Sequence, residues 1–405
     1  MSSTRRPILC ILAVSIVFLT EAKSQWTQIQ CPANVGNLWC IDFTPAGPTY
    51  SPMGYIGSDR GMLRSLNDGN WFYTEPESYA VHGFAFIYPS MGTAACNGGR
   101  LLVTQVSGTT WVESNVGQVP WVDFQAVSRP DLYNAFAVGS FGRIAKSTDG
   151  GNNWTSTTLS GYDGTFHQLH FFNASNGVIV GDGGKLVRRT DGGWLDVPSG
   201  TSSTLRDLHF PTATIGYITG DGGVLLKTTD AGYTWQPLQS PTQENLYAVH
   251  FESEMAGFIA GAGGKLWGTE DGGANWVLEV VDGMMPDDRI NAINVHEDSY
   301  YAVGDHGLIA TRQLLVGIAE PWPEVMGMRI MPNPVNNLVH LTFPNMASEP
   351  LQVDILNASG QCVLSVVPDR SGQGMDVPVG DLPTGPYVCR VRYVHSLISA
   401  GFIKE

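Results

Sequence analysis

The chain has 405 residues, of which 43% are hydrophobic, 15% are charged and 48 are glycine, and it contains 11 tryptophans. Apolar residues are too frequent for a disordered chain, and glycine shows no period of three, which excludes a collagen-like protein. The formal net charge of −15 argues against a nucleic acid or an anionic membrane as partner, because both require a basic surface. The length predicts more than one domain. Glycine and tryptophan enriched together favour many short strands joined by tight turns.

Residues 1–24 have the pattern of a secretory signal peptide. A basic pair, Arg5 and Arg6, precedes an apolar core at residues 8–19, and small residues end the segment before Gln25. The apolar run is shorter than the ~20 residues of a membrane-spanning helix, and no later segment is long enough to span a bilayer. We therefore expect an exported chain without a transmembrane segment. Removal of the leader leaves 19 basic and 36 acidic residues.

The cysteines that follow the leader are Cys31, Cys40, Cys96, Cys362 and Cys389. Their odd number leaves at least one thiol outside any disulfide within the chain. Two pairs, Cys31 with Cys40 and Cys362 with Cys389, are candidate disulfides in an oxidising compartment. The default interpretation is that the cysteines are structural or buried, and no Cys-x-x-Cys spacing indicates a zinc site.

A repeat occupies most of the chain. A full copy has a Gly-rich turn, a short apolar strand, an Asp-containing turn and a tryptophan. Four copies occur at residues 139–154, 181–194, 220–235 and 261–276, degraded copies occur at residues 57–71 and 96–111, and a truncated copy starts at Gly304. The register is kept by six tryptophans spaced by 40, 43, 40, 41 and 41 residues, namely Trp71, Trp111, Trp154, Trp194, Trp235 and Trp276. This period is the length of one four-stranded propeller blade. The sequence therefore predicts an all-β fold with a seven-bladed β-propeller over residues 25–318.

The two ends of the repeat predict how the ring closes. The seventh copy stops after its third strand and lacks the Asp turn and the tryptophan. Trp26 lies 45 residues before Trp71, so we expect the N-terminal segment to supply the missing outer strand and to remove the exposed edge. Trp322 is the alternative, but it lies between two prolines, which suits a linker better than a strand.

The turn before each tryptophan carries a family resemblance. Residues 147–154 follow the Asp-box pattern Ser/Thr-x-Asp-x-Gly-x-x-Trp, as do residues 228–235 and 269–276, whereas blade 4 has Arg189 in the Ser/Thr place. With the Gly-rich phrase before it, residues 38–312 resemble Asp-box (BNR-like) propellers of the photosystem II assembly/stability factor-like family. This resemblance implies a fold and leaves function open. It implies structural roles for Asp149, Asp191, Asp230, Asp271, Trp154, Trp235 and Trp276.

The last part of the chain has a different pattern. After a Pro-containing linker at residues 319–327, residues 328–405 contain strand patterns that predict a small Ig-like β-sandwich, at residues 338–343, 351–356, 362–367 and 387–392. Three phrases resemble the type A C-terminal sorting domain of type IX secretion, and their key residues are Pro332, Asn333, Pro334, Gly360, Leu382, Pro383, Gly385 and Tyr387. The resemblance implies that the type IX machinery is a partner of residues 328–405. It also implies a secreted or outer-surface location in a Gram-negative bacterium, reached through the periplasm.

Two repeated sets of side chains are candidate ligand contacts. His170, His209 and His250 recur at one position of the inner strand in blades 4–6, although residues related by rotation diverge, which favours packing over a metal site. A basic arc recurs just after the Gly-rich turn, at Arg100, Arg143, Lys185 and Lys265. This arc could engage an acidic or glycan ligand, and the alternative is that an exposed strand start simply tolerates cations.

These observations favour a non-enzymatic binding or scaffold protein that holds an unidentified protein or glycan on one propeller face, with no cofactor and no metal. Two alternatives remain open, a glycoside hydrolase acting on a polysaccharide and a purely structural surface protein. The Asp-box aspartates lie at the periphery of different blades, too far apart for a glycosidase pair. The Arg-Ile-Pro phrase of sialidases is also missing from the propeller. Two carboxylates within about 10 Å in a groove across one face would support the hydrolase.

Overall fold

The computed structural model describes residues 26–32, 34–45, 52–65, 70–76, 79–117, 122–279, 281, 284–285, 287–296, 299–313, 329–331, 335–342, 352–357, 362–367, 374–392 and 397–404. Within these ranges the chain forms β-strands and four short 3-10 turns, and no α-helix occurs. No helix in the described ranges is therefore long and apolar enough to cross a membrane. The predicted signal peptide (1–24) and linker (319–327) lie outside these residues, and the domain limits stay predictions.

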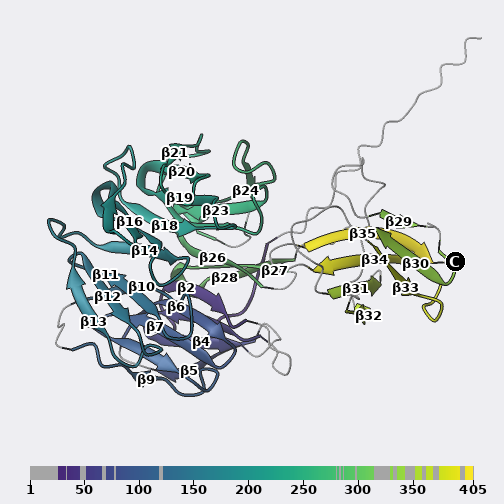
Figure 1. Cartoon of the computed structure of the whole chain (residues 1–405), viewed down its shortest axis with the longest axis horizontal. Helices are drawn as coiled ribbons and strands as arrows, with labels where there is room; N and C mark the ends of the chain where they lie inside the picture. Colours follow the sequence, from purple (N-terminus) through teal and green to yellow (C-terminus); the bar gives the residue numbers. More distant parts are fainter. Residues whose placement is uncertain are drawn as a thin grey trace, which may run out of the picture.

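Seven antiparallel sheets of four strands surround a common centre (Figure 1), which confirms the seven-bladed propeller. Blade 1 consists of β2 (Leu38–Phe43), β3 (Gly54–Ser58), β4 (Gly61–Ser65) and β5 (Trp71–Pro76). Blade 2 consists of β6 (Val81–Tyr88), β7 (Met91–Cys96), β8 (Leu101–Thr104) and β9 (Val112–Glu113). Blade 3 consists of β10 (Phe124–Ser128), β11 (Ala135–Gly139), β12 (Arg143–Ser147) and β13 (Thr155–Thr158).

Blades 4 to 6 follow the same order, with a 3-10 turn between the second and third strands. Blade 4 consists of β14 (Phe166–Phe171), β15 (Gly177–Gly181), η1 (Asp182–Gly184), β16 (Leu186–Thr190) and β17 (Gly193–Asp196). Blade 5 consists of β18 (Leu205–His209), β19 (Gly216–Gly220), η2 (Asp221–Gly223), β20 (Leu225–Thr228) and β21 (Gln236–Pro237). Blade 6 consists of β22 (Leu246–Phe251), β23 (Gly257–Gly261), η3 (Ala262–Gly264), β24 (Leu266–Thr269) and β25 (Val277–Glu279). The first strands of successive blades contact one another around the ring, so they enclose the propeller axis.

Blade 7 joins the two ends of the propeller. It contains β26 (Ile290–His296), β27 (Ser299–Gly304), η4 (Asp305–Gly307) and β28 (Ile309–Gln313), and its outer strand is β1 (Thr27–Gln28). Thr27 pairs with Thr311 and Gln28 pairs with Ala310. The predicted closure by the N-terminal segment is confirmed. Trp322, the alternative closing residue, lies outside the described residues.

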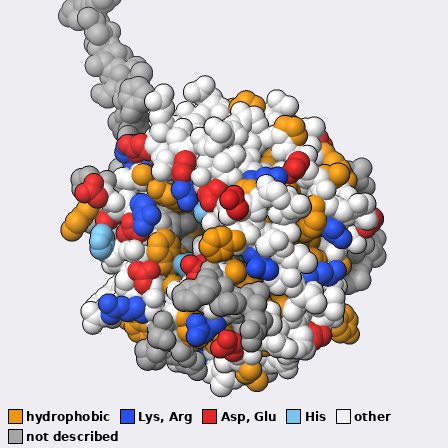
Figure 2. All heavy atoms as spheres, turned by 90° about the vertical axis from the view of Figure 1, so that its left-hand side faces the viewer, with side chains coloured by type: hydrophobic (Ala, Val, Ile, Leu, Met, Phe, Trp, Pro, Cys, Tyr) orange, Lys and Arg blue, Asp and Glu red, His pale blue; other side chains and the backbone are white. Residues whose placement is uncertain are grey.

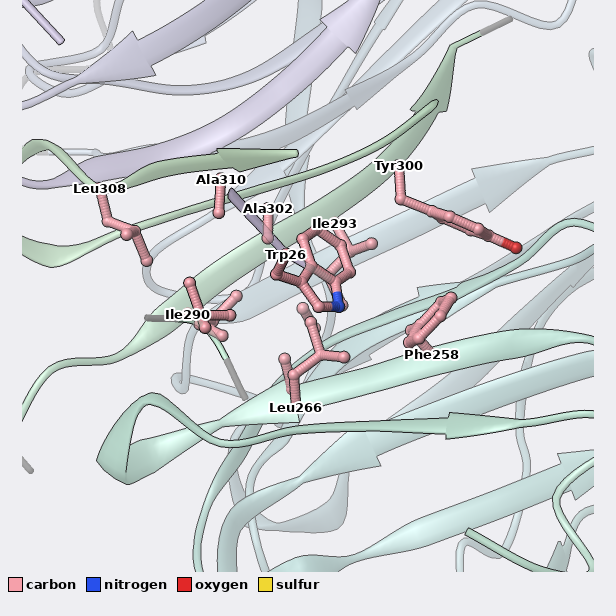
Figure 3. Close-up of a cluster of buried hydrophobic side chains, with 12 residues drawn as sticks. Trp26, Phe258, Leu266, Ile290, Ile293, Tyr300, Ala302, Leu308 and Ala310 are labelled. Atoms are coloured by element: carbon pink, nitrogen blue, oxygen red, sulfur yellow. The ribbon is translucent and has the colours of Figure 1, made fainter. Parts of the chain in front are cut away.

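The indole of Trp26 anchors the closing segment in the seam between blades 6 and 7. It is 2% exposed and packs among buried side chains of both blades, including Phe258, Leu266, Ile290 and Tyr300 (Figure 3). The indole nitrogen of Trp26 donates a hydrogen bond of 2.9 Å to Glu279, at the end of β25. A two-residue strand pairing is thereby supported by a large buried side chain.

Burial changes across each blade in a way that explains its sequence pattern. Every residue of the second strand is buried in blades 1, 3, 4, 5 and 6, because the neighbouring blades cover both faces. The fourth strand is mostly exposed, as in β13 and β21. An unbroken apolar run in the second strand and a polar fourth strand are therefore what stacked sheets require.

In blades 3 to 7 a glycine ends the second strand, because the backbone next to the inner strand passes close by. A Cβ atom at Gly220 would lie 2.3 Å from the carbonyl oxygen of Thr204, and one at Gly261 would lie 2.0 Å from that of Asn245. Gly220 has an extended φ of −168°, so the requirement here is space. Gly222, two residues later, has a φ of +70°, which glycine adopts at little cost.

The C-terminal part consists of two antiparallel sheets. One contains β29 (Arg329–Met331), β30 (Leu338–Thr342) and β33 (Gly374–Pro378), and the other contains β32 (Cys362–Val366), β31 (Gln352–Asn357), β34 (Gly385–Arg392) and β35 (Leu397–Lys404). Buried residues of both sheets form one core, which includes Val339, Val377, Ile355 and Val391. The four predicted strands are present, and the Ig-like classification of this sandwich stays a prediction.

The candidate disulfides do not form. Cys31, Cys40, Cys362 and Cys389 are all free thiols in the described structure. Burial raises the pKa of Cys31 to about 11, which keeps this thiol protonated and poorly nucleophilic.

Candidate functional site

Every inner strand of the propeller carries a β-bulge at its second residue. In blade 5, for example, Leu205 pairs with Gly220 and Asp207 pairs with Thr219, so Arg206 is left without a partner in the ladder of backbone pairs. A bulge re-aims the side chain of the extra residue. The same shift occurs in all seven blades and defines what we call the bulge ring, Trp39, His82, Gln125, His167, Arg206, Tyr247 and Asn291.

The bulge ring lies on the propeller face that carries the turns between the second and third strands, which we call the turn face. In blades 4 and 5 the side chain of the ring bonds to the first residue of the turn in its own blade. His167 lies 2.8 Å from Asp182, and Arg206 donates to both carboxylate oxygens of Asp221, at 2.9 and 2.7 Å. These bonds fix the direction of the ring side chains.

Blades 7 and 1 use the same arrangement with different donors. Arg289, one residue before β26, donates to both oxygens of Asp305 at 2.8 and 3.2 Å. The indole nitrogen of Trp39 donates to Asp59 at 2.7 Å. Asn291 donates to the backbone oxygen of Leu38 at 2.9 Å and so links blade 7 to blade 1.

Cationic and aromatic groups follow one another across five consecutive blades on this face, and we call this series the aromatic–arginine series. The guanidinium of Arg206 lies 5.8 Å from the ring centre of Tyr247, and that of Arg289 lies 5.5 Å from Tyr247 and 5.7 Å from Trp39. The rings of Trp39 and His82 follow with their centres 5.8 Å apart. All five side chains are partly exposed. The distances from the guanidinium groups to the rings fall within the range of cation–π attraction.

Neighbouring groups determine the protonation states of the side chains in the aromatic–arginine series. The hydrogen bonds that Arg206 and Arg289 donate to Asp221 and Asp305 raise the pKa of each arginine. Burial lowers the pKa of His82, so this ring is neutral at pH 7. The series therefore presents two permanent cations, each beside an aspartate, among neutral aromatic rings.

The three predicted histidines lie together on the inner strands but perform a different task. The ring centres of His209 and His250 are 4.3 Å apart, and the backbone N–H of Phe251 donates to Nδ1 of His209 at 3.2 Å. Burial lowers the pKa of His170 and His250 to about 4, and that of His209 well below its usual value. His209 thus joins blade 5 to blade 6 as a neutral hydrogen-bond acceptor.

Other blades use different residues for this inter-blade bond. Ser128, at the same position in blade 3, accepts from the backbone N–H of Phe171 at 3.3 Å. Asp42, at this position in blade 1, accepts a backbone hydrogen bond from Phe86, and burial raises its pKa to about 7. No group of three or more His, Cys, Asp or Glu side chains among the described residues is placed to hold a metal. A ligand role for the three histidines stays a prediction.

The predicted basic arc is engaged within the propeller. Lys265 contacts both carboxylate oxygens of Glu244 at 2.7 and 2.8 Å, Lys185 bonds to Asp196, and Arg100 lies 3.7 Å from Glu113. The fourth member, Arg143, donates to Ser156 at 3.2 Å. Figure 2 shows acidic and basic side chains intermingled over the side of the molecule that it draws. A ligand contact by any of these four residues stays a prediction.

The Asp-box residues organise the turns between the third and fourth strands. Asp230 accepts from the hydroxyl of Thr228 at 2.7 Å and from the backbone N–H and hydroxyl of Thr234 at 2.9 and 2.7 Å. Asp149 and Asp271 make the corresponding bonds. The exposed Asp191, in the shortened turn of blade 4, makes none of these bonds within the described structure.

The tryptophans of the Asp boxes close the same turns. Trp154 and Trp235 donate to the backbone oxygens of Gly151 and Gly232 at 2.9 and 3.3 Å. Trp276 is partly buried and packs against the core between blades 5 and 6. These contacts show how the repeated residues support the blade edges.

The sorting-domain residues lie partly within the described structure. The hydroxyl of Tyr387 donates to the backbone oxygen of Pro383 at 2.8 Å, and Leu382 packs against the core of the sandwich. Gly385 has a φ of +150°. The remaining predicted residues, Pro332, Asn333, Pro334 and Gly360, lie outside the described residues.

The bulge ring and the aromatic–arginine series were not predicted from the sequence. Each ring residue follows the first apolar residue of an inner strand, and alignment of the seven strands at this position would have shown large polar or aromatic side chains in every blade. Arg289 lies outside this alignment because it precedes its strand. Only the contacts show that it stands between Tyr247 and Trp39.

The architecture is that of an Asp-box β-propeller followed by a β-sandwich, and comparisons with known proteins agree with both parts. Residues 234–313 match the family described as photosynthesis system II assembly factor YCF48, and residues 329–405 match the secretion system C-terminal sorting domain. Both resemblances inferred from the sequence are confirmed. No curated protein is significantly similar in sequence to the chain.

Solved structures support the propeller fold. A structure described as "YCF48 bound to D1 peptide" has a TM-score of 0.57 and 17% identity, and covers 71% of this chain and 96% of that chain. The structure of YCF48 from Cyanidioschyzon merolae has a TM-score of 0.59 and 18% identity, and covers 72% of this chain and 99% of that chain. At these identities the likeness concerns the fold alone.

Proposed function

We propose that this protein is an exported binding protein that holds a partner polypeptide on the turn face of its propeller. The observation that carries the proposal is the aromatic–arginine series of Arg206, Tyr247, Arg289, Trp39 and His82. Tryptophan, tyrosine and arginine are the residues that most often dominate the binding energy of protein interfaces. Here they are partly exposed, adjacent and held in place by hydrogen bonds, so little side-chain entropy is lost when a partner binds.

The C-terminal sandwich supports the second part of the proposal, which is that the protein is exported. The match of residues 329–405 to a secretion sorting domain favours delivery by the type IX machinery to the outer surface or the medium of a Gram-negative bacterium. A neighbour of similar fold was solved with a bound peptide, which supports a peptide as the kind of ligand that such a propeller takes.

Binding is tested with purified protein against a library of surface and secreted polypeptides, with hydrolysis of polysaccharides monitored in parallel. Tyr247→Ala should weaken binding of a captured partner at least tenfold, because a central aromatic anchor contributes about 2 kcal/mol or more. Tyr133→Ala is the matched control, because Tyr133 is 66% exposed and lies outside the aromatic–arginine series. Equal effects of the two substitutions would contradict the proposed surface, and polysaccharide turnover would favour a hydrolase.

Export is tested separately by deletion of residues 328–405. The truncated propeller should accumulate in the periplasm, whereas the full chain should reach the surface or the medium. Immunoblots of the two fractions measure the difference. Appearance of the truncated protein outside the cell would contradict the sorting role of the sandwich.

A further inference from the structure

Blade 6 lacks a carboxylate that the neighbouring blades possess. The 3-10 turn begins with Asp182 in blade 4, with Asp221 in blade 5 and with Asp305 in blade 7, and each of these carboxylates is hydrogen-bonded to a side chain of the turn face. In blade 6 the corresponding residue is Ala262. The series of donor and carboxylate pairs is therefore interrupted between blades 5 and 7.

The backbone at Ala262 follows the same course as in the other blades. Its N–H donates to the backbone oxygen of Asn245 at 2.9 Å, just as the N–H of Asp221 donates to that of Thr204 at 2.9 Å. Ala262 is partly exposed. The space beyond its methyl group is thus where an aspartate side chain would stand in the neighbouring blades.

The donors around this position remain in place. Tyr247 is the bulge-ring residue of blade 6, and the guanidinium groups of Arg206 and Arg289 lie 5.8 and 5.5 Å from its ring. Each arginine uses only its Nε and Nη2 atoms for the aspartate of its own blade. Arg289 also hydrogen-bonds to Tyr247. Because a guanidinium carries five N–H groups, the Nη1 side of Arg206 can bind a second acceptor. The Tyr247 hydroxyl accepts from the Asn245 amide at 3.3 Å, which leaves its proton to donate.

We propose that the gap at Ala262 is the binding site for a single carboxylate of a polypeptide partner, either a C-terminus or an acidic side chain. This inference rests on the proposed function and specifies the chemistry of the bound group. The ligand carboxylate takes the place of the missing aspartate and accepts hydrogen bonds from the Tyr247 hydroxyl and from Arg206, while Arg289 contributes its positive charge. Charge-assisted bonds of this kind are among the strongest that proteins form.

Two observations favour a peptide over an acidic polysaccharide. The protein has a net charge of −15, which repels a chain of many negative charges more strongly than a single carboxylate. The gap also lies within the aromatic–arginine series, a composition typical of protein interfaces. The acidic residue nearest to Tyr247 along the chain, Glu244, is engaged by Lys265 and so leaves the gap to the ligand.

The decisive variant is Ala262→Asp, which restores the residue type of the neighbouring blades. The probes are a library of N-acetylated heptapeptides with free C-termini, the same library amidated, and oligogalacturonates, each titrated against the purified protein. We expect peptides with a carboxylate to bind, and Ala262→Asp to weaken them on the order of tenfold or more. Ala262→Asn is the matched control, because it has the same size without the charge, and it should retain most of the affinity.

The possible results distinguish failure of the carboxylate site from failure of the proposed function. Binding that Tyr247→Ala removes but Ala262→Asp leaves unchanged would overturn the carboxylate site and keep the proposed function. Equal losses in Ala262→Asp and Ala262→Asn would mean that size rather than charge excludes the ligand, and would also overturn the carboxylate site. Tighter binding of oligogalacturonate than of any peptide would overturn the choice of a peptide. Absence of binding by all three probes would overturn the inference outright.

Discussion

Replacement of Trp26 by alanine tests whether the short N-terminal segment closes the propeller. Trp26 is 2% exposed and contributes to a core shared by blades 6 and 7. Its substitution removes the largest side chain of this core and the hydrogen bond to Glu279. The strand β1, which has only two residues, then has little to hold it against β28.

The expected loss follows from this burial. Truncation of a fully buried tryptophan to alanine lowers the free energy of unfolding by about 3–5 kcal/mol. Whole domains are stable by only about 5–15 kcal/mol, so the variant should be markedly weakened. Without β1, the edge of β28 is exposed, and an exposed edge favours aggregation.

Urea unfolding followed by fluorescence measures the loss, and hydrogen exchange at Ala310 and Thr311 reports the opening of β28. Trp194→Ala is the matched control, since Trp194 is only partly buried and lies in β17 of blade 4. The control should be less destabilising and should leave exchange in β28 unchanged. A loss below about 1 kcal/mol for Trp26→Ala, with β28 still protected, would refute closure by this residue.

Three further predictions concern the scaffold. Asp230→Ala should lower the free energy of unfolding by about 1–2 kcal/mol, because the hydrogen-bond donors of its turn lose their acceptor. Asp191→Ala, at an exposed position, should change this free energy little, and urea titrations of the two variants make the comparison. Burial lowers the pKa of His250 to about 4, so the unfolded chain takes up this proton first as the pH falls below 6.5. The free energy of unfolding should then fall by up to about 1.4 kcal/mol per pH unit from this group between pH 6.5 and 4. His250→Asn should flatten the measured profile by that amount, and an unchanged slope would contradict the assigned protonation state. Glu279→Gln should lower the free energy of unfolding by about 1–3 kcal/mol, because it removes the negative charge that is hydrogen-bonded to the partly buried Arg312. A urea midpoint like that of the unmodified protein would contradict a stabilising role of this pair.

Periodicity made the fold predictable from the sequence. The spacing of the tryptophans indicated the length of a blade, and the distance from Trp26 to Trp71 indicated which segment completes blade 7. The hydrogen bonds of Asp230 join residues only a few positions apart, so a short sequence motif was enough to draw attention to this turn. Short motifs that repeat at a constant spacing can be recognised directly in a sequence.

The candidate site was not predictable in the same way. The bulge at Arg206 is a property of register between two strands, and the contact of Arg289 with Trp39 joins the last blade to the first. The missing carboxylate at Ala262 is recognised only when the turns of the different blades are compared, because an alanine by itself does not indicate a binding site. The two candidate disulfides failed for a related reason, since separation along the chain does not determine whether two thiols meet.

Closure by the N-terminal segment also has a consequence for the order of folding. Thr27 cannot pair with Thr311 until the last blade has been synthesised, so the first strand of the propeller to be made is the last to find its partner. Contacts between such distant positions form slowly, because the intervening chain must be ordered first. The contact between blades 6 and 7 therefore stays incomplete until synthesis of the propeller ends, and a chain interrupted before blade 7 would leave a hydrophobic edge exposed to chaperones and proteases.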